Sequence, residues 1–207
     1  MANSNLRRWL LQPIALLALM TAIAACGGGL ATSELQGEAI ENPTEKPSFT
    51  LTDTSGESYD FAAETEGRLT LLYFGYLNCP DICPVHLAQI AEVFARMPDV
   101  AREAEVVFVS VDPGRDSPEE IREFLDNFDP RFVGLTGTEE ELVTAQRAVG
   151  IPPAVTGGEG ADYTVDHAGW VIAYGPDGFN HAIYPFGTRQ SQWDNDLQIL
   201  VTLEETE

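Results

Sequence analysis

Two cysteines, Cys79 and Cys83, stand with three residues between them, directly after an apolar run at residues 69–76. The length of that run and its aliphatic and aromatic content predict a buried strand. Helically spaced apolar residues begin at Leu87, and Pro84 suits the first turn of the helix that they predict. Cys83 therefore lies at a helix N-terminus, where free N–H groups and the helix dipole favour a thiolate. Such a pair can bind a soft metal or exchange electrons; a structural disulfide is the alternative that an exported chain permits.

The elements that must position these thiols alternate along the chain. After a hairpin at 49–61, the predicted elements are a strand at 69–76, a helix at 84–96, a strand at 106–111, a helix at 117–128, a strand at 131–135 and a helix at 138–149. The helix at 117–128 begins with a capping sequence, Ser117, Pro118 and Glu120.

The rest of the chain breaks this alternation. Paired prolines and clustered glycines mark an inserted loop at residues 150–166, and a hairpin at 170–186 and a helix at 188–202 follow. The order predicts an α/β, thioredoxin-like fold. We expect a central mixed sheet flanked by helices, with an N-terminal hairpin and an inserted loop before the C-terminal hairpin.

The N-terminus predicts export and a lipid anchor. Arg7 and Arg8 precede an apolar stretch at residues 10–25, which is short for a transmembrane helix of about 20 residues. It ends in Ile23-Ala24-Ala25-Cys26, which resembles a bacterial lipobox. We expect residues 1–25 to be a lipoprotein signal peptide and Cys26 to be lipidated on the extracytoplasmic face of the bacterial cell membrane. An ordinary signal peptide or an uncleaved anchor is the alternative.

Composition separates a tether from one domain. Residues 26–47 are rich in Gly, Glu, Thr and Pro, which predicts a flexible tether, and residues 48–207 suit a single domain. The formal net charge is −22, with Lys46 the only lysine. Such a charge disfavours nucleic acid and anionic lipid as partners. It leaves open whether the acidic surface serves solubility or docking of a basic protein.

Three motifs together resemble the Sco/SenC family of copper-binding proteins. They are Tyr73-Phe74-Gly75-Tyr76 leading to Cys79-Pro80-Asp81-Ile82-Cys83-Pro84, then Phe108-Val109-Ser110-Val111-Asp112-Pro113 with Arg115-Asp116-Ser117-Pro118-Glu119, then Val165-Asp166-His167. The resemblance implies copper, as Cu(I) or Cu(II), bound by Cys79, Cys83 and His167. It also implies a metallochaperone that assists assembly of the dinuclear copper centre in subunit II of cytochrome c oxidase. Ala168-Gly169 stand where the family commonly has Ser.

The chemistry of the residues agrees with that implication. Cu(I) prefers soft thiolates, whereas imidazole suits both copper oxidation states. Asp81 and Asp166 are candidates to orient the ligands from behind, with capping and turn formation as the alternative. His86 and His181 match no ligand of the family, and we expect neither to bind metal. Asp112 is expected to be structural or to face a partner.

The main alternative is a thiol-disulfide oxidoreductase that keeps the copper-site cysteines of the oxidase reduced. In that role Cys79 is the attacking sulfur and Cys83 the resolving one, and the two alternate between dithiol and disulfide. A peroxidase is disfavoured, because no Thr precedes Cys79 at peroxiredoxin spacing. Under the leading hypothesis the chain is a carrier and not an enzyme. Its partners are the oxidase subunit, an extracytoplasmic copper donor and a thiol reductant.

Overall fold

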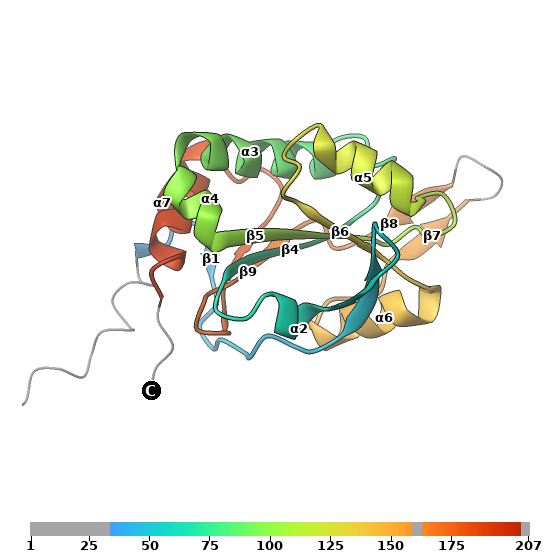
Figure 1. Ribbon diagram of the computed structural model, residues 1–207, viewed down its shortest axis with the longest axis horizontal. Coiled ribbons are helices and arrows are strands. Elements are labelled where there is room, and N and C mark those ends of the chain that lie inside the picture. Colours follow the sequence, from blue (N-terminus) through green and yellow to red (C-terminus); the bar gives the residue numbers. More distant parts are fainter. Residues whose placement is uncertain (1–33, 159–162, 204–207) are drawn as a thin grey trace, which may run out of the picture.

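The computed structural model describes residues 34–158 and 163–203, which form one α/β layer structure (Figure 1). Its strands are β1 (Glu38–Ala39), β2 (Thr50–Asp53), β3 (Ser58–Asp60), β4 (Leu69–Gly75), β5 (Ala104–Ser110), β6 (Val133–Thr136), β7 (Val155–Gly157), β8 (Thr164–Asp166), β9 (Val171–Tyr174) and β10 (Asn180–Tyr184). Its helices are α2 (Phe61–Glu64), α3 (Ile82–Arg96), α4 (Pro98–Glu103), α5 (Pro118–Asp126), α6 (Glu139–Ala148) and α7 (Gln190–Leu200).

Eight strands form one mixed sheet in the order β1-β10-β9-β4-β5-β6-β2-β3. The central strands β4, β5 and β6 are parallel, and β9 pairs antiparallel with β4 on the other side. All seven residues of β4 are buried, as expected for a strand with neighbours on both edges and helices on both faces. The predicted central mixed sheet with flanking helices is confirmed.

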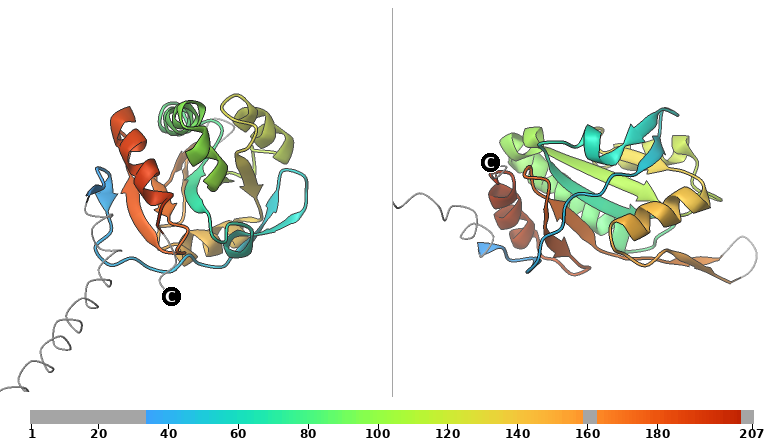
Figure 2. Two further views of the ribbon diagram at one scale, coloured as in Figure 1. Left: turned by 60° about the vertical axis from the view of Figure 1, so that its left-hand side comes forward. Right: turned by 90° about the horizontal axis from the view of Figure 1, so that it is seen from below.

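The helices divide between the two faces of this sheet (Figures 1 and 2). On one face lie α3, α5 and α7, and on the other lie α6 and the short α2. The predicted capping sequence is confirmed: Ser117 accepts a hydrogen bond from the Glu120 N–H, and the Glu120 carboxylate accepts one from the Ser117 N–H. A second capping box, Thr138 with Glu141, fixes the start of α6.

Part of the predicted tether is folded onto the sheet. Within the described residues, β1 pairs with β10, and Glu45 forms a bridge with Phe179. The buried carboxylate of Asp196 accepts hydrogen bonds from the backbone N–H groups of Gln36 and Gly37 at 2.8 and 2.7 Å. The composition of this stretch predicted flexibility, but contacts made by α7 and β10, far along the chain, hold it in place. The predicted boundary at residue 48 is therefore wrong for residues 36–47.

The inserted stretch also differs from the prediction. It contains a two-stranded hairpin, β7 paired with β8, rather than an irregular loop. Two short helices, α2 and α4, were not predicted, and α3 begins at Ile82, two residues earlier than expected. The predicted signal peptide and Cys26 fall within residues 1–33, which lie outside the described residues.

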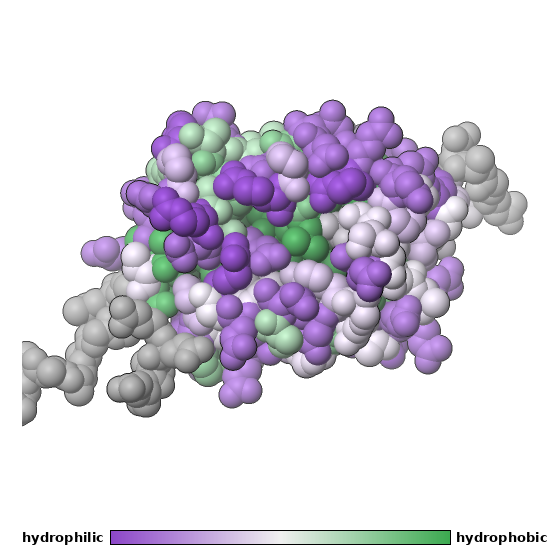
Figure 3. All heavy atoms as spheres, viewed as in Figure 1, coloured by the Kyte–Doolittle hydropathy of each residue, from purple (hydrophilic) through white to green (hydrophobic). Residues whose placement is uncertain are grey.

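The surface is mostly hydrophilic on one face of the molecule (Figure 3). Hydrophilic side chains cover most of the face shown in Figure 3, with hydrophobic ones gathered near its centre and upper left. In the described part of the chain, no helix combines the length and the apolar character needed to cross a bilayer.

Candidate metal centre

The cysteine turn begins where β4 leaves the sheet. The Val111 N–H donates to the Gly75 carbonyl at 2.8 Å, and the Cys79 N–H donates to the Tyr76 carbonyl at 3.2 Å, which closes the turn. The following helix starts at Ile82, so Cys83 is its second residue. Cys83 is fully buried, whereas Cys79 keeps 8% of its surface exposed. Cys79 thus lies at the mouth of the site and Cys83 at its base.

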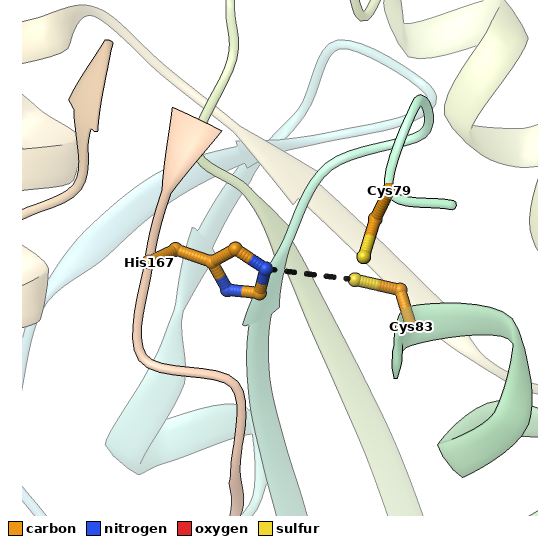
Figure 4. Close-up of side chains that lie close together, drawn as sticks. All are labelled: Cys79, Cys83 and His167. Atoms are coloured by element: carbon orange, nitrogen blue, oxygen red, sulfur yellow. Dashed lines mark hydrogen bonds between the residues drawn. The ribbon is translucent and has the colours of Figure 1, made fainter. Parts of the chain in front are cut away.

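His167 comes from a distant part of the sequence and lies beside the two cysteines. It directly follows β8, and its imidazole Nδ1 lies 2.9 Å from the carbonyl oxygen of Phe74. Because a carbonyl only accepts, Nδ1 is the protonated nitrogen in this arrangement, which leaves the Nε2 lone pair available. Nε2 lies 3.9 Å from the Cys83 sulfur, and Figure 4 shows all three side chains pointing toward one another.

Together the three side chains form a compact donor set. One atom from each of Cys79, Cys83 and His167 lies within 4.8 Å of the other two. A metal bonded to sulfur and nitrogen at about 2.0–2.3 Å can bridge donors separated by about 4 Å. Both cysteines are free thiols in this structure. Two soft sulfurs and one imidazole are a donor set that suits copper in either oxidation state.

The two thiols differ in their acidity. The pKa of Cys79 is lowered well below its usual range, because its thiolate accepts hydrogen bonds from the Cys83 thiol and from the backbone N–H groups of Cys83 and Asp81. The pKa of Cys83 is raised, because it donates to the Cys79 sulfur and is buried. The helix N-terminus predicted a thiolate at Cys83, and this was wrong. The N–H groups at that terminus instead stabilise the charge on Cys79.

Three supporting features were missed by sequence reasoning. The Tyr73 hydroxyl donates to the Cys83 sulfur at 3.2 Å. The carbonyl of Phe74 orients His167, and Gly75 provides space: a Cβ there would lie 2.8 Å from the Cys83 sulfur. A strand-end carbonyl has no sequence signal. Tyr73 and Gly75 lie within the motif that precedes the cysteines, which is the signal that could have found them.

The remaining candidates lie outside the donor set. Asp81 and Asp166 are exposed, and among the described residues neither carboxylate forms a hydrogen bond with a cysteine or with His167. Asp81 instead donates its backbone N–H to the Cys79 sulfur. His86 is fully buried against Tyr73, with Nε2 3.3 Å from the Pro185 carbonyl. His181 pairs with Asp177 at 2.8 Å. Neither histidine joins the cluster, as expected.

Comparison with known proteins assigns the chain to a family. The SCO1/SenC family model matches residues 37–202. The chain belongs to the SCO1/SenC family. A protein of Stutzerimonas stutzeri, named as a candidate copper-binding protein, is 35% identical over 147 residues, covering 69% of this chain and 71% of that protein.

Solved structures agree with this assignment. ScoI of Bradyrhizobium japonicum with copper bound is 30% identical in sequence, with a TM-score of 0.67. The match covers 76% of this chain and 100% of the Bradyrhizobium chain. Apo Sco1 of Thermus thermophilus is 28% identical, with a TM-score of 0.73 over 81% and 97% of the two chains. The thioredoxin-like fold is thereby confirmed. The predicted metal, copper, is the one bound in the Bradyrhizobium relative, and the Cys79, Cys83 and His167 donor set fits it.

A more distant SCO1/SenC structure has the same fold. BsSco, described as a member of a family of cytochrome c oxidase assembly proteins, is 23% identical with a TM-score of 0.62 over 81% of this chain and 100% of that one.

Removing the Tyr73 hydroxyl should change the titration of the thiols. In Tyr73→Phe, the Cys83 thiolate loses its hydrogen-bond donor, so its pKa rises further and fewer thiolates form at a given high pH. Thiolate ultraviolet absorbance against pH measures this. Tyr59→Phe is the matched control, because its hydroxyl contacts Glu105 and not a cysteine. Identical titrations of both variants would contradict the role of Tyr73.

Proposed function

We propose that this chain is a copper carrier that holds one copper ion through Cys79, Cys83 and His167. The orientation of His167 carries the proposal: its Nδ1 is engaged by a backbone carbonyl, so its Nε2 is available beside two sulfurs. Second partners that fix a histidine in this way are typical of metal ligands. Copper-bound relatives of the same family support the choice of metal.

The thiols determine when copper can be loaded. Both sulfurs bind metal as thiolates, and Cys79 already carries its charge, so Cys83 must lose its proton to the solvent as copper binds. Copper loading therefore requires the reduced protein and becomes more favourable as pH rises. A disulfide between Cys79 and Cys83 would remove both thiolates.

The cellular role follows from the family and from the N-terminal sequence. The carrier assists assembly of the dinuclear copper centre in subunit II of cytochrome c oxidase, while anchored by lipid at Cys26 to the extracytoplasmic face of the bacterial membrane. Its further partners are a copper donor and a thiol reductant. The description of a family member as an oxidase assembly protein supports this role.

A thiol-disulfide oxidoreductase is the second candidate, and the unequal thiols favour it. Cys79 is the more exposed sulfur and has the lower pKa, as an attacking thiolate requires, and Cys83 is positioned to resolve a mixed disulfide. This chemistry makes no use of His167 as a ligand. The histidine therefore separates the two functions.

Copper binding by the reduced domain tests the ligand set. We expect one copper per chain, and a sharp loss of affinity in Cys79→Ser, Cys83→Ser and His167→Ala, because each removes one ligand of three. Competition with a Cu(I) chelator measures the affinities. His181→Gln is the control, since its side chain pairs with Asp177 outside the site. Wild-type affinity in His167→Ala would rule out this ligand set.

Lipidation is tested on the mature protein. We expect mass spectrometry to find a diacylglyceryl group on Cys26 and no residues before it, because the lipobox places cleavage there. Cys26→Ser should leave the leader uncleaved. An unmodified Cys26 in the mature wild-type protein would contradict the anchor.

The carrier and the reductase make different predictions in cells. His167→Ala leaves both thiols in place, so a carrier should lose assembly of the oxidase copper centre while reduction of a model disulfide by the purified variant barely changes. Oxidase copper content and the disulfide reduction rate are the two measurements. Normal oxidase assembly with this variant would favour the reductase.

A further inference from the structure

The hairpin that delivers His167 stands apart from the main sheet. Among the described residues, β7 pairs only with β8, and neither joins the eight-stranded sheet. The hairpin extends beyond the sheet at one end of the molecule (Figures 1 and 2). Strand pairing therefore does not fix the hairpin, and with it His167, relative to Cys79 in the loop after β4 and Cys83 on α3.

Packing beneath the hairpin is also incomplete. A cavity lies between it and α6, lined by Ala154 and Thr156 from the hairpin and by Leu142 and Gln146 from the helix. At the base of the hairpin, the Ala154 N–H donates to the Gln146 side-chain oxygen at 3.3 Å. The hairpin is thus not closely packed at this cavity, whereas Val165 on β8 is buried in the core.

Tyr163, the residue before β8, makes several contacts with the turn that follows β5. Its hydroxyl donates a short hydrogen bond to the Asp112 carboxylate. The Arg115 guanidinium lies 3.6 Å from the centre of the Tyr163 ring, and its Nη1 donates to the Tyr163 carbonyl at 3.0 Å. Asp112 is 2% exposed and pairs with Arg115 at 2.6 Å. The ion pair of buried Asp112 with partly buried Arg115 therefore holds Tyr163 by its ring, its hydroxyl and its backbone.

The same turn holds the cysteine loop. Asp116, one residue beyond Arg115, accepts hydrogen bonds from the Ser110 hydroxyl at 2.6 Å and from the Leu77 N–H at 3.0 Å. Leu77 lies two residues before Cys79. The segment from Ser110 to Asp116 thus contacts both arms of the site, the cysteine loop through Asp116 and the histidine hairpin through Asp112 and Arg115.

We propose that Tyr163 is a positioning residue for copper binding, which holds His167 over the two thiols through its contacts with Asp112 and Arg115. The inference rests on the proposed function, because it gives Tyr163 its effect only through His167 as a ligand. Only the three residues of β8 separate Tyr163 from His167. A short extended segment transmits the position of one end to the other with little slack.

A double-mutant cycle on copper affinity tests this role. Tyr163→Ala should lower the Cu(I) affinity about 10- to 100-fold when His167 is present, which is the usual effect of removing a residue that orients a ligand. In the His167→Ala background the same substitution should change affinity by no more than about twofold, because the group that it positions is gone. Tyr163→Phe, which keeps the ring but loses the hydroxyl, should give a smaller loss of the same pattern.

Two measurements separate this role from a general structural one. In the apo protein, NMR of the His167 imidazole should show loss of the Nδ1–H signal bonded to Phe74 in Tyr163→Ala. Thr156→Ala, on the same hairpin, is the control and should leave that signal and the affinity unchanged. Tyr163→Phe keeps the test decisive if Tyr163→Ala does not fold.

The outcomes distinguish the two proposals. Unchanged affinity in His167→Ala alone would overturn the ligand set and the positioning role together. A loss in His167→Ala but none in Tyr163→Ala and Tyr163→Phe would overturn the positioning role alone. So would equal losses from Tyr163→Ala with and without His167, since Tyr163 would then act on the fold or on the cysteines.

Discussion

The bond between His167 and the carbonyl of Phe74 is the interaction on which the site depends. Along β4 the carbonyls alternate between the two edges of the strand. The Gly75 carbonyl points to the β5 side, where it accepts a hydrogen bond from the Val111 N–H. Phe74 therefore turns its carbonyl toward β9. Pairing with β9 ends one residue earlier, at Tyr73 with Val171, which leaves that carbonyl for the imidazole at 2.9 Å. Because β9 begins only at Val171, the Phe74 carbonyl is left to bind Nδ1 of His167, and Nε2 is the nitrogen that faces the thiols.

The same strand end limits which residues can follow Phe74. A Cβ at Gly75 would lie 2.8 Å from the Cys83 sulfur and 2.7 Å from the Phe108 ring, which is closer than side chains approach. Glycine lets the first turn of α3 rest directly on the strand. Cys83 is consequently buried, and the Tyr73 hydroxyl, itself within the core, can reach its sulfur at 3.2 Å. The lack of a side chain at Gly75 allows the Cys83 thiol, the Tyr73 phenol and the His167 imidazole to lie in a single cluster.

Local patterns predicted much of this structure, and long-range contacts account for what they missed. The cysteine turn after β4 and the capping box at Ser117 rest on signals within a few residues, and both are as expected. The composition of residues 36–39 predicts flexibility, yet hydrogen bonds to Asp196, about 160 residues away, hold this segment in place. No local pattern reports such a contact. The prediction of a thiolate at Cys83 was wrong for a similar reason, because the position at a helix N-terminus does not reveal that Cys83 is buried and donates to the Cys79 sulfur.

The arrangement around the thiols helps to distinguish a copper carrier from a thiol-disulfide reductase. Thiol exchange needs an accessible thiolate, which Cys79 supplies at the mouth of the site, and a resolving thiol behind it. It does not need an imidazole 3.9 Å from the buried sulfur, held by a backbone carbonyl and delivered by a hairpin outside the sheet. Ordering that hairpin costs conformational entropy, and burying the carboxylates of Asp112 and Asp116 has a desolvation cost that their hydrogen bonds and the ion pair with Arg115 offset. Contacts that fix His167 at such cost stabilise a three-donor site, whereas a dithiol would function without them.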